Sequence, residues 1–207
     1  MRTASFSLLT ILCLMLAVAP AMADTAYSNG PYNGTTDAWT TNFGFAVSDS
    51  FTVSSGSDID GLNFVYWDAS STDLLTTVDM QIGSTSFGGS TQRLSLVTNQ
   101  FISTNQYGYF LYEAGYSFAG IPWSGSGFVT LSNACSTSGC SVSNPIYWDE
   151  NSGPSSAYEN TLGSIPSEAF TLTGGTCCET TPEPSSIMLF GSGILGIVGV
   201  LRRRLMG

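Results

Sequence analysis

The sequence contains no histidine and no lysine. Without histidine the chain can form neither a Ser-His-Asp triad nor a Cys-His dyad, and it lacks the commonest protein ligand of zinc and copper. The main routes to nucleophilic hydrolysis and to transition-metal catalysis are therefore closed. We expect a protein that is not an enzyme, and a secreted hydrolase is the least favoured function.

Positive charge is scarce throughout the interior of the chain. Between residues 24 and 181, Arg93 is the only cation, against nine aspartates and five glutamates, which gives this segment a net charge of −13. Such a segment repels phosphate backbones and anionic membrane surfaces, so no nucleic-acid partner is expected. Charged residues are only 10% of the whole chain, so solubility depends mainly on Ser, Thr, Asn and Gly. This composition suits an extracellular protein and neutral glycans.

Residues 1–23 have the pattern of a secretory signal peptide. Arg2 precedes an apolar run at residues 6–19, and Ala21 and Ala23 form an A-x-A cleavage site before the mature chain. The alternative is a retained membrane helix, for which 14 apolar residues are short. We therefore predict a short helix that is removed on export.

The opposite end of the chain combines a break, an apolar run and a basic cluster. Pro182-Glu183-Pro184 ends regular structure, because proline lacks an N–H and disfavours helical geometry in the residue before it. It lies in a predicted linker at residues 175–186. Residues 187–201 carry no charge, and we predict that they form a transmembrane helix. The basic tail at residues 202–207 would remain cytoplasmic under the positive-inside rule.

This tail resembles the PEP-CTERM sorting signal of Gram-negative bacteria. The resemblance rests on three elements in one order: Pro182-Glu183-Pro184, a short hydrophobic helix, and the cluster Arg202, Arg203 and Arg204. It implies recognition and cleavage by an exosortase-type membrane transpeptidase, in species that export a polysaccharide matrix. The precursor would be anchored in the inner membrane and the product would reach the outer cell envelope or the extracellular space. A plain C-terminal anchor is the alternative.

The body between the two ends, residues 24–174, has the periodicity of β-structure. Apolar and aromatic residues alternate with small or polar ones, and no ten-residue stretch has apolar residues at helical spacing. The expected strands lie near residues 43–47, 51–53, 59–67, 78–82, 94–96, 101, 107–112, 116–118, 128–131, 146–148 and 169–172. Some of these segments are halves of one strand, and the resulting nine or ten short strands indicate a single all-β domain, an antiparallel sandwich or jelly roll. Residues 59–67 and 78–82 are expected to form a hairpin.

Four cysteines remain after removal of the signal peptide. Cys135 and Cys140 flank four small residues, a spacing that suits a disulfide closing a hairpin in an oxidising compartment. Cys177 and Cys178 are adjacent, and a strained vicinal disulfide and bonds to partner chains are both open for them. A zinc site there would need ligands that are not evident.

Aromatic residues are abundant in the body and have two interpretations. A sugar ring stacks its C–H face on an aromatic plane while its hydroxyls pair with nearby polar groups. The candidates for such a platform are Trp67, Trp123, Tyr147, Trp148 and Tyr158. Alternatively these rings fill the core. A structural or adhesive protein is the favoured function, and a carbohydrate-binding module for matrix polysaccharide is the rival.

Acidic residues offer weak support for catalysis or metal binding. Asp149 and Glu150 are adjacent, so on a strand they point to opposite faces and make a poor glycosidase pair. Asp58-Ile59-Asp60-Gly61 begins like a calcium loop, but the residues that follow lack the required oxygen ligands. We predict no catalytic or metal site from specific residues, and calcium held by converging loops is the only cofactor left open.

Overall fold

The computed structural model describes residues 24–140 and 144–176. The predicted signal peptide, the linker with its sorting motif, the predicted membrane helix and the basic tail lie outside these residues, as do Cys177 and Cys178. All regular secondary structure in the described residues is β-strand, as the alternation predicts. No helix long and apolar enough to cross a membrane occurs among them.

Eleven strands are present in the described residues. In chain order they are β1 (Thr25–Ser28), β2 (Ala38–Thr40), β3 (Ala46–Asp68), β4 (Leu75–Gly83), β5 (Ser90–Ser95), β6 (Thr98–Thr104), β7 (Phe110–Ser136), β8 (Ile146–Asp149), β9 (Ala157–Glu159), β10 (Gly163–Ile165) and β11 (Phe170–Thr176).

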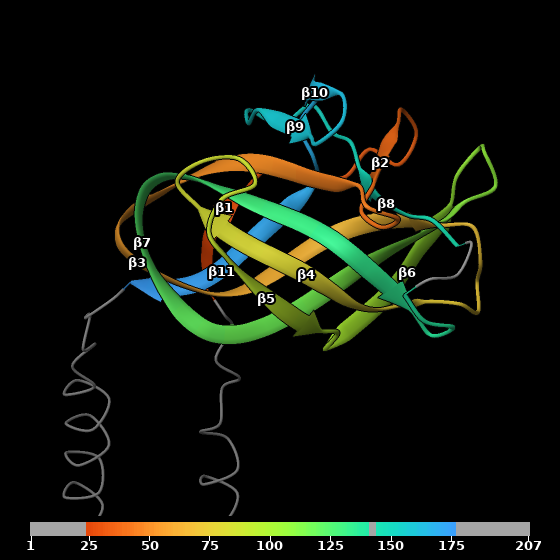
Figure 1. Cartoon of the computed structure of the whole chain (residues 1–207), viewed down its shortest axis with the longest axis horizontal. Coiled ribbons are helices and arrows are strands. Elements are labelled where there is room, and N and C mark those ends of the chain that lie inside the picture. The colour runs from red at the N-terminus through yellow and green to blue at the C-terminus, as the bar shows by residue number, and fades with distance from the viewer. Residues whose placement is uncertain (1–23, 141–143, 177–207) are drawn as a thin grey trace, which may run out of the picture. The chain divides into compact units, whose positions relative to one another are not determined.

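Two long strands organise the sheet. β3 and β7 are antiparallel neighbours along almost the whole of β3, from Ala46 to Asp68, and together they sweep across the molecule in Figure 1. Their register shifts after Val53 and again after Ile59. Such bulges bend a strand and increase its twist, so one strand can serve both layers of a fold.

The two halves of each long strand have different neighbours. The first half of β3 pairs with β9, and its second half pairs with β11 and β8. The first half of β7 likewise pairs with β6, and its second half pairs with β4. The sheet therefore curls upon itself and encloses one core. The predicted all-β antiparallel fold is confirmed, and a single curled sheet supplies its layers.

The predicted hairpin between residues 59–67 and 78–82 is wrong. These residues belong to β3 and β4, and β7 lies between the two strands. The separate short strands expected at residues 43–53 and 59–67 are also largely one strand, β3. Alternation shows which residues are extended and which side chains are buried, but it does not identify the partner of a strand.

Aromatic side chains form the centre of the core. Trp148 is completely buried, and its ring meets those of Phe64 and Phe170 edge-on at centroid distances of 5.8 and 5.6 Å. Its Nε1 donates a hydrogen bond of 3.0 Å to the carbonyl of Ala169. Burial of each such side chain contributes roughly 1.5–3 kcal/mol. These contacts join β3, β8 and β11.

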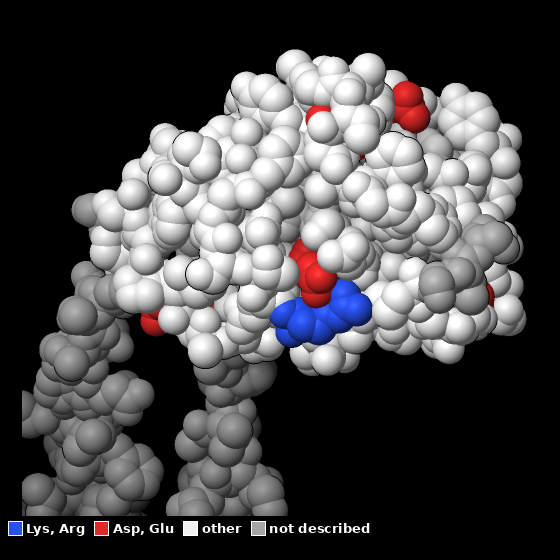
Figure 2. Space-filling model, in the orientation of Figure 1, with Lys and Arg blue, Asp and Glu red and all other residues white. Residues whose placement is uncertain are grey.

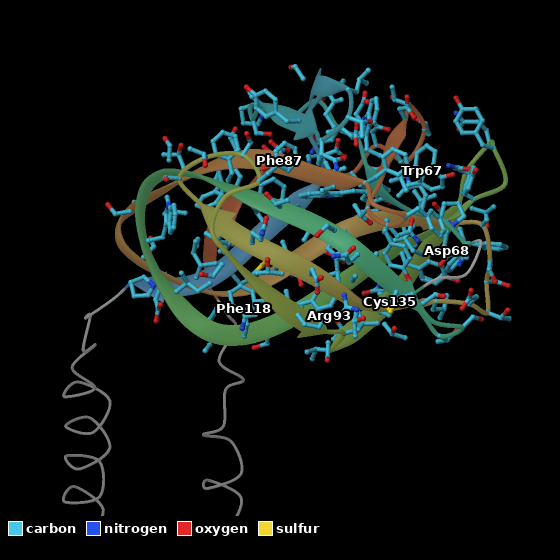
Figure 3. All side chains as sticks on the ribbon, viewed as in Figure 1. Trp67, Asp68, Phe87, Arg93, Phe118 and Cys135 are labelled. Atoms are coloured by element: carbon cyan, nitrogen blue, oxygen red, sulfur yellow. A yellow bond between two sulfur atoms is a disulfide. The ribbon has the colours of Figure 1, made fainter. Side chains whose placement is uncertain are left out.

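One turn is fixed by a covalent bond. Cys135 and Cys140 form a disulfide across the turn that follows β7. Arg93 lies beside it, as Figure 3 shows, and donates hydrogen bonds to Asp79 Oδ1 at 2.8 Å and to the carbonyl of Asn133 at 2.9 Å. Arg93 is the only cation of the described residues, and most of the face shown in Figure 2 is uncharged.

Candidate binding groove

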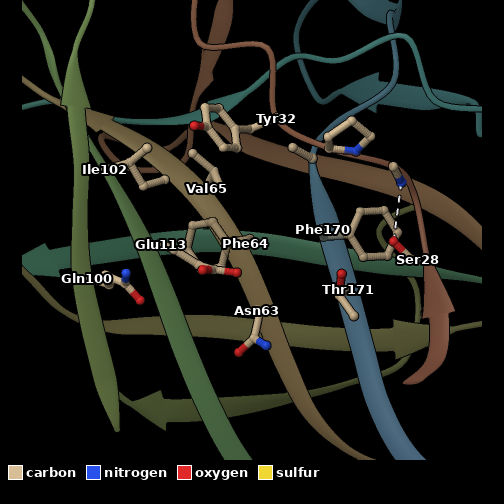
Figure 4. A pocket seen from close by; sticks show the side chains of 13 residues that line it. Ser28, Tyr32, Asn63, Phe64, Val65, Gln100, Ile102, Glu113, Phe170 and Thr171 are labelled. Carbon is tan, nitrogen blue, oxygen red and sulfur yellow. Dashed lines mark hydrogen bonds between the residues drawn. The ribbon is translucent and has the colours of Figure 1, made fainter. Parts of the chain in front are cut away.

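A groove of about 490 Å³ lies on the outer face of the sheet formed by β11, β3, β7 and β6 (Figure 4). The segment after β1 forms one wall and includes Gly30, Pro31 and Tyr32. The sheet contributes polar side chains, among them Asn63, Gln100, Glu113 and Thr171, together with the apolar Val65 and Ile102.

Strand register explains why these side chains share a face. Gln100 of β6 is opposite Glu113 of β7, and Glu113 is opposite Val65 of β3. Thr171 of β11 is opposite Asn63 in the same way. Because side chains alternate along a strand, the neighbouring residues Phe64 of β3, Ala114 of β7 and Leu172 of β11 point inward and are buried in the core. The groove is therefore the outer surface of three strands whose other face is packed, and β6 forms its border.

A second hollow of about 240 Å³ continues from the first and shares Asn63 with it. Gly61 and Gly115 lie in its floor. A Cβ at Gly61 would collide with Oγ1 of Thr173, and one at Gly115 would collide with Oγ1 of Thr98. Because Gly61 and Gly115 have no side chain, the hydroxyls of Thr173 and Thr98 can lie directly against the backbone of the sheet. The hollow therefore stays open along the strands.

Three polar side chains of the groove are available to a ligand. The amides of Asn63 and Gln100 and the carboxylate of Glu113 make no hydrogen bond within residues 24–140 and 144–176, whereas Ser28 Oγ accepts one from the N–H of Gly30. Tyr32 exposes 42% of its surface at the end of the groove. An aromatic ring beside uncommitted amide, hydroxyl and carboxylate groups can bind a ligand that carries many hydroxyls.

The wall that carries Tyr32 is held in place by a buried carboxylate. Asp149 accepts hydrogen bonds from the backbone N–H groups of Asn33 and Gly34, both at 2.9 Å, and from Nε1 of Trp67 at 2.5 Å. Burial raises the pKa of Asp149 to about 6. This aspartate is therefore committed to positioning the loop next to Tyr32.

A buried polar cluster lies under the same wall. Nδ2 of Asn29 is within hydrogen-bonding distance of Asp49 Oδ2 (3.1 Å), Ser155 Oγ (2.7 Å), Ser167 Oγ (2.7 Å) and the Glu168 carbonyl (2.6 Å). Its two amide hydrogens serve four acceptors. Since these residues come from widely separated parts of the chain, the cluster ties the N-terminal segment to the loops before β9 and before β11.

Two carboxyl groups of this cluster have raised pKa values. Glu168 is fully buried, neither of its carboxyl oxygens has a hydrogen-bond partner among the described residues, and its N–H donates to Asp49 Oδ2 at 2.7 Å. Burial, followed by the charge of Asp49, raises the pKa of Glu168 well above its ordinary value. Burial also raises the pKa of Asp49 to about 6. The pair is sealed from solvent, which makes it structural in character.

The predicted aromatic platform is corrected at two positions. Trp148 is completely buried and Trp67 is 4% exposed, so neither ring can stack on a sugar. Trp67 and Tyr147 belong to one aromatic cluster, because both contact Tyr109. The ring centroid of Tyr109 lies 5.8 Å from that of Trp67 and 5.5 Å from that of Tyr147.

The other predicted aromatic residues lie apart from this cluster and outside the groove lining. Trp123 packs against Phe51 with a ring-centroid distance of 5.8 Å, and Tyr158 packs against Phe128 with a ring-centroid distance of 6.2 Å. The groove residues Tyr32, Asn63, Gln100 and Glu113 were not predicted. Their signal in the sequence is a polar side chain at an outward strand position, or a tyrosine directly after a Gly-Pro turn, and both features are common on any β protein.

The candidate calcium loop is part of a strand. Residues 58–61 lie inside β3, where their backbone pairs with β7 and β11. Among residues 24–140 and 144–176, no group of three or more acidic or cysteine side chains is arranged to hold a metal ion.

Comparison with known families bears on the C-terminal end of the chain. Residues 180–204 match the family model of the PEP-CTERM protein-sorting motif. The match spans Pro182-Glu183-Pro184 and the cluster from Arg202 to Arg204, and it confirms the resemblance identified from the sequence. It indicates an exported protein that is anchored in a membrane before an exosortase, itself a membrane protein, processes it. No curated protein matches the chain.

Proposed function

We propose that this chain is a non-enzymatic protein of the outer cell envelope or extracellular matrix, with a structural or adhesive role. The observation that carries the proposal is the sorting motif at residues 180–204, which indicates export and processing. The bond that is cleaved releases the body from its inner-membrane anchor.

The character of the body supports a structural role. The buried carboxylates of Asp49 and Asp149 accept hydrogen bonds from backbone and side-chain donors of the protein itself. They hold loops together and have no access to a substrate. The disulfide between Cys135 and Cys140 suits an oxidising location outside the cytoplasm.

Mass spectrometry of the mature C-terminus tests the sorting step. In the wild-type protein recovered from the cell surface or medium, we expect residues 202–204 to be absent. We expect Glu183→Ala to leave full-length precursor in the inner-membrane fraction, and Glu179→Ala, outside the matched residues, to be processed normally. A surface-exposed wild-type product that still ends with the arginine cluster would contradict the proposal.

A carbohydrate-binding role is the second candidate. It is favoured by the groove between Tyr32 and Asn63, whose polar side chains are uncommitted. The platform first predicted from the tryptophans does not support it, since Trp67 and Trp148 are buried.

A further inference from the structure

We infer that the groove over β11, β3, β7 and β6 binds an extended segment of a neutral polysaccharide, with Tyr32 at one end and Asn63 in the middle. This inference rests on the adhesive role proposed above and names its ligand class. It assigns glycan binding to residues other than the aromatic platform predicted from the sequence.

The shape of the site fits a chain better than a compact ligand. The hollows of about 490 and 240 Å³ adjoin at Asn63, and both are open to solvent along the face of the sheet. Gly61 and Gly115 keep the floor low where the two hollows continue along the strands. A linear polymer can lie across both hollows without burying its ends.

The chemistry of the lining fits a ligand rich in hydroxyl groups. Asn63 and Gln100 each offer an amide donor and acceptor, Glu113 offers an acceptor, and Thr98 and Thr173 offer hydroxyls. Tyr32 supplies an exposed aromatic ring for stacking on the C–H face of one sugar. Apolar side chains also line the two hollows, among them Val65, Ile102 and Val97, and they offer contact area for the C–H faces of further sugar rings.

The charge of the lining selects against acidic polymers. Glu113 and Asp60 are the ionisable acids among the lining residues, and none of the lining residues is a cation. Arg93, the single cation of the described residues, belongs to β5 and lies outside both hollows. A uronate or sulfated chain would meet repulsion with no compensating partner.

The backbone of the groove floor selects against an extended peptide. β3 and β7 pair with neighbours on both sides, so their N–H and carbonyl groups are already used within the sheet. A peptide that binds by strand addition needs an unpaired edge. The floor formed by β3 and β7 therefore offers a ligand only side chains, as in the binding of a glycan, whereas β6 at the border of the groove pairs only with β7 among the described strands.

Affinity electrophoresis of the full chain in neutral detergent tests the inference. The gels contain hydroxyethylcellulose, galactomannan or dextran as neutral polymers, and alginate as the acidic one. We expect retardation by at least one neutral polymer and none by alginate. Tyr32→Ala and Gln100→Ala should each weaken the interaction about tenfold, consistent with loss of one stacking ring or one amide in a multi-contact site.

Controls separate this inference from the sorting proposal and from misfolding. Tyr107→Ala removes an aromatic ring that is 59% exposed outside the groove, and it should leave retardation unchanged. Glu183→Ala should also bind normally, because sorting and binding use different residues. Absence of retardation by all three neutral polymers overturns the inference. The inference is also overturned if Tyr107→Ala abolishes retardation while Tyr32→Ala and Gln100→Ala retain it. Thermal unfolding confirms that each variant is folded.

Discussion

Two asparagines show how differently the same type of side chain is used in this protein: Asn29 directly follows β1, and Asn63 lies on β3. Asn29 is completely buried, and its amide lies within hydrogen-bonding distance of four acceptors from distant parts of the chain. Asn63 lines the open groove, and its amide has no protein partner in the described residues. The first is occupied by the fold, whereas the second is available to a ligand.

The contrast separates structural polar groups from functional ones. Buried acids with raised pKa values often indicate an active site. Here Asp49 and Asp149 are saturated by internal donors, and their role is to hold loops. The groove has solvent-accessible polar groups that make no hydrogen bond within the described part of the chain. The proposed binding site therefore rests on available hydrogen-bonding capacity, and the raised pKa values are assigned to the fold.

Among the buried residues, Trp148→Ala is expected to have the largest effect on stability. It removes a fully buried ring that packs on Phe64 and Phe170, and we expect the free energy of unfolding to fall by about 4 kcal/mol. Urea denaturation of the full chain measures this. Tyr158→Ala, at a half-buried ring, should cost much less. A Trp148 variant of wild-type stability would show that the ring is not part of the core.

The two asparagines themselves give the next largest difference. Asn29→Ala removes one of the buried donors to the carboxylate of Asp49 and the donor to the buried carbonyl of Glu168, and we expect a loss of about 3 kcal/mol in urea denaturation. Asn63→Ala should change stability by less than about 0.5 kcal/mol, because no internal hydrogen bond is lost. Equal losses in the two variants would remove the distinction between committed and available polar groups.

A smaller effect is expected from pH. The folded-state pKa values of Asp49 and Asp149 are raised to about 6, and that of Glu168 is raised well above its ordinary value. The folded state therefore binds more protons than the unfolded state between about pH 4 and 7, and its stability falls as pH rises through this window. We expect a gain of about 2–3 kcal/mol on lowering the pH from 7 to 5, mainly from the two aspartates.

Thermal unfolding across this range measures the pH dependence. Glu168→Gln keeps the shape of the side chain and removes one titrating group, so its stability should depend less on pH at the upper end of the range. Glu113→Gln, in the exposed groove, is the matched control and should retain the wild-type profile. Stability that rises with pH from 5 to 7 would mean that the buried acids are ionised in the folded protein.

The sequence predicted the longer strands, missed the short strands β1, β2, β9 and β10, and predicted strand partners poorly. Alternation located the inward residues of β3 and β11, because burial of one face imposes a period of two. It could not show that β7 lies between β3 and β4, since pairing depends on contacts between distant segments. The buried cluster around Asn29 could not be predicted for the same reason, because Asn29 is more than 100 residues from Ser155 and Ser167.

The candidate site was predicted less well than the fold. Trp67 and Trp148 were prominent as tryptophans, yet their size favours burial, and both lie in the interior. Gln100 and Glu113 form one row across the groove only because β6 and β7 are in a particular register. A sequence pattern that does not specify register cannot bring such residues together.

The pairing of the first strand with the last sets the order in which this protein can fold during export. Thr25 of β1 is opposite Thr173 of β11, and β11 also pairs with β3. A chain that emerges from its N-terminus cannot complete the sheet until β11 has crossed. Such long-range pairing is slow, on the order of milliseconds to seconds. The sorting motif begins a few residues after β11, so the body becomes able to fold just as the segment that anchors it arrives.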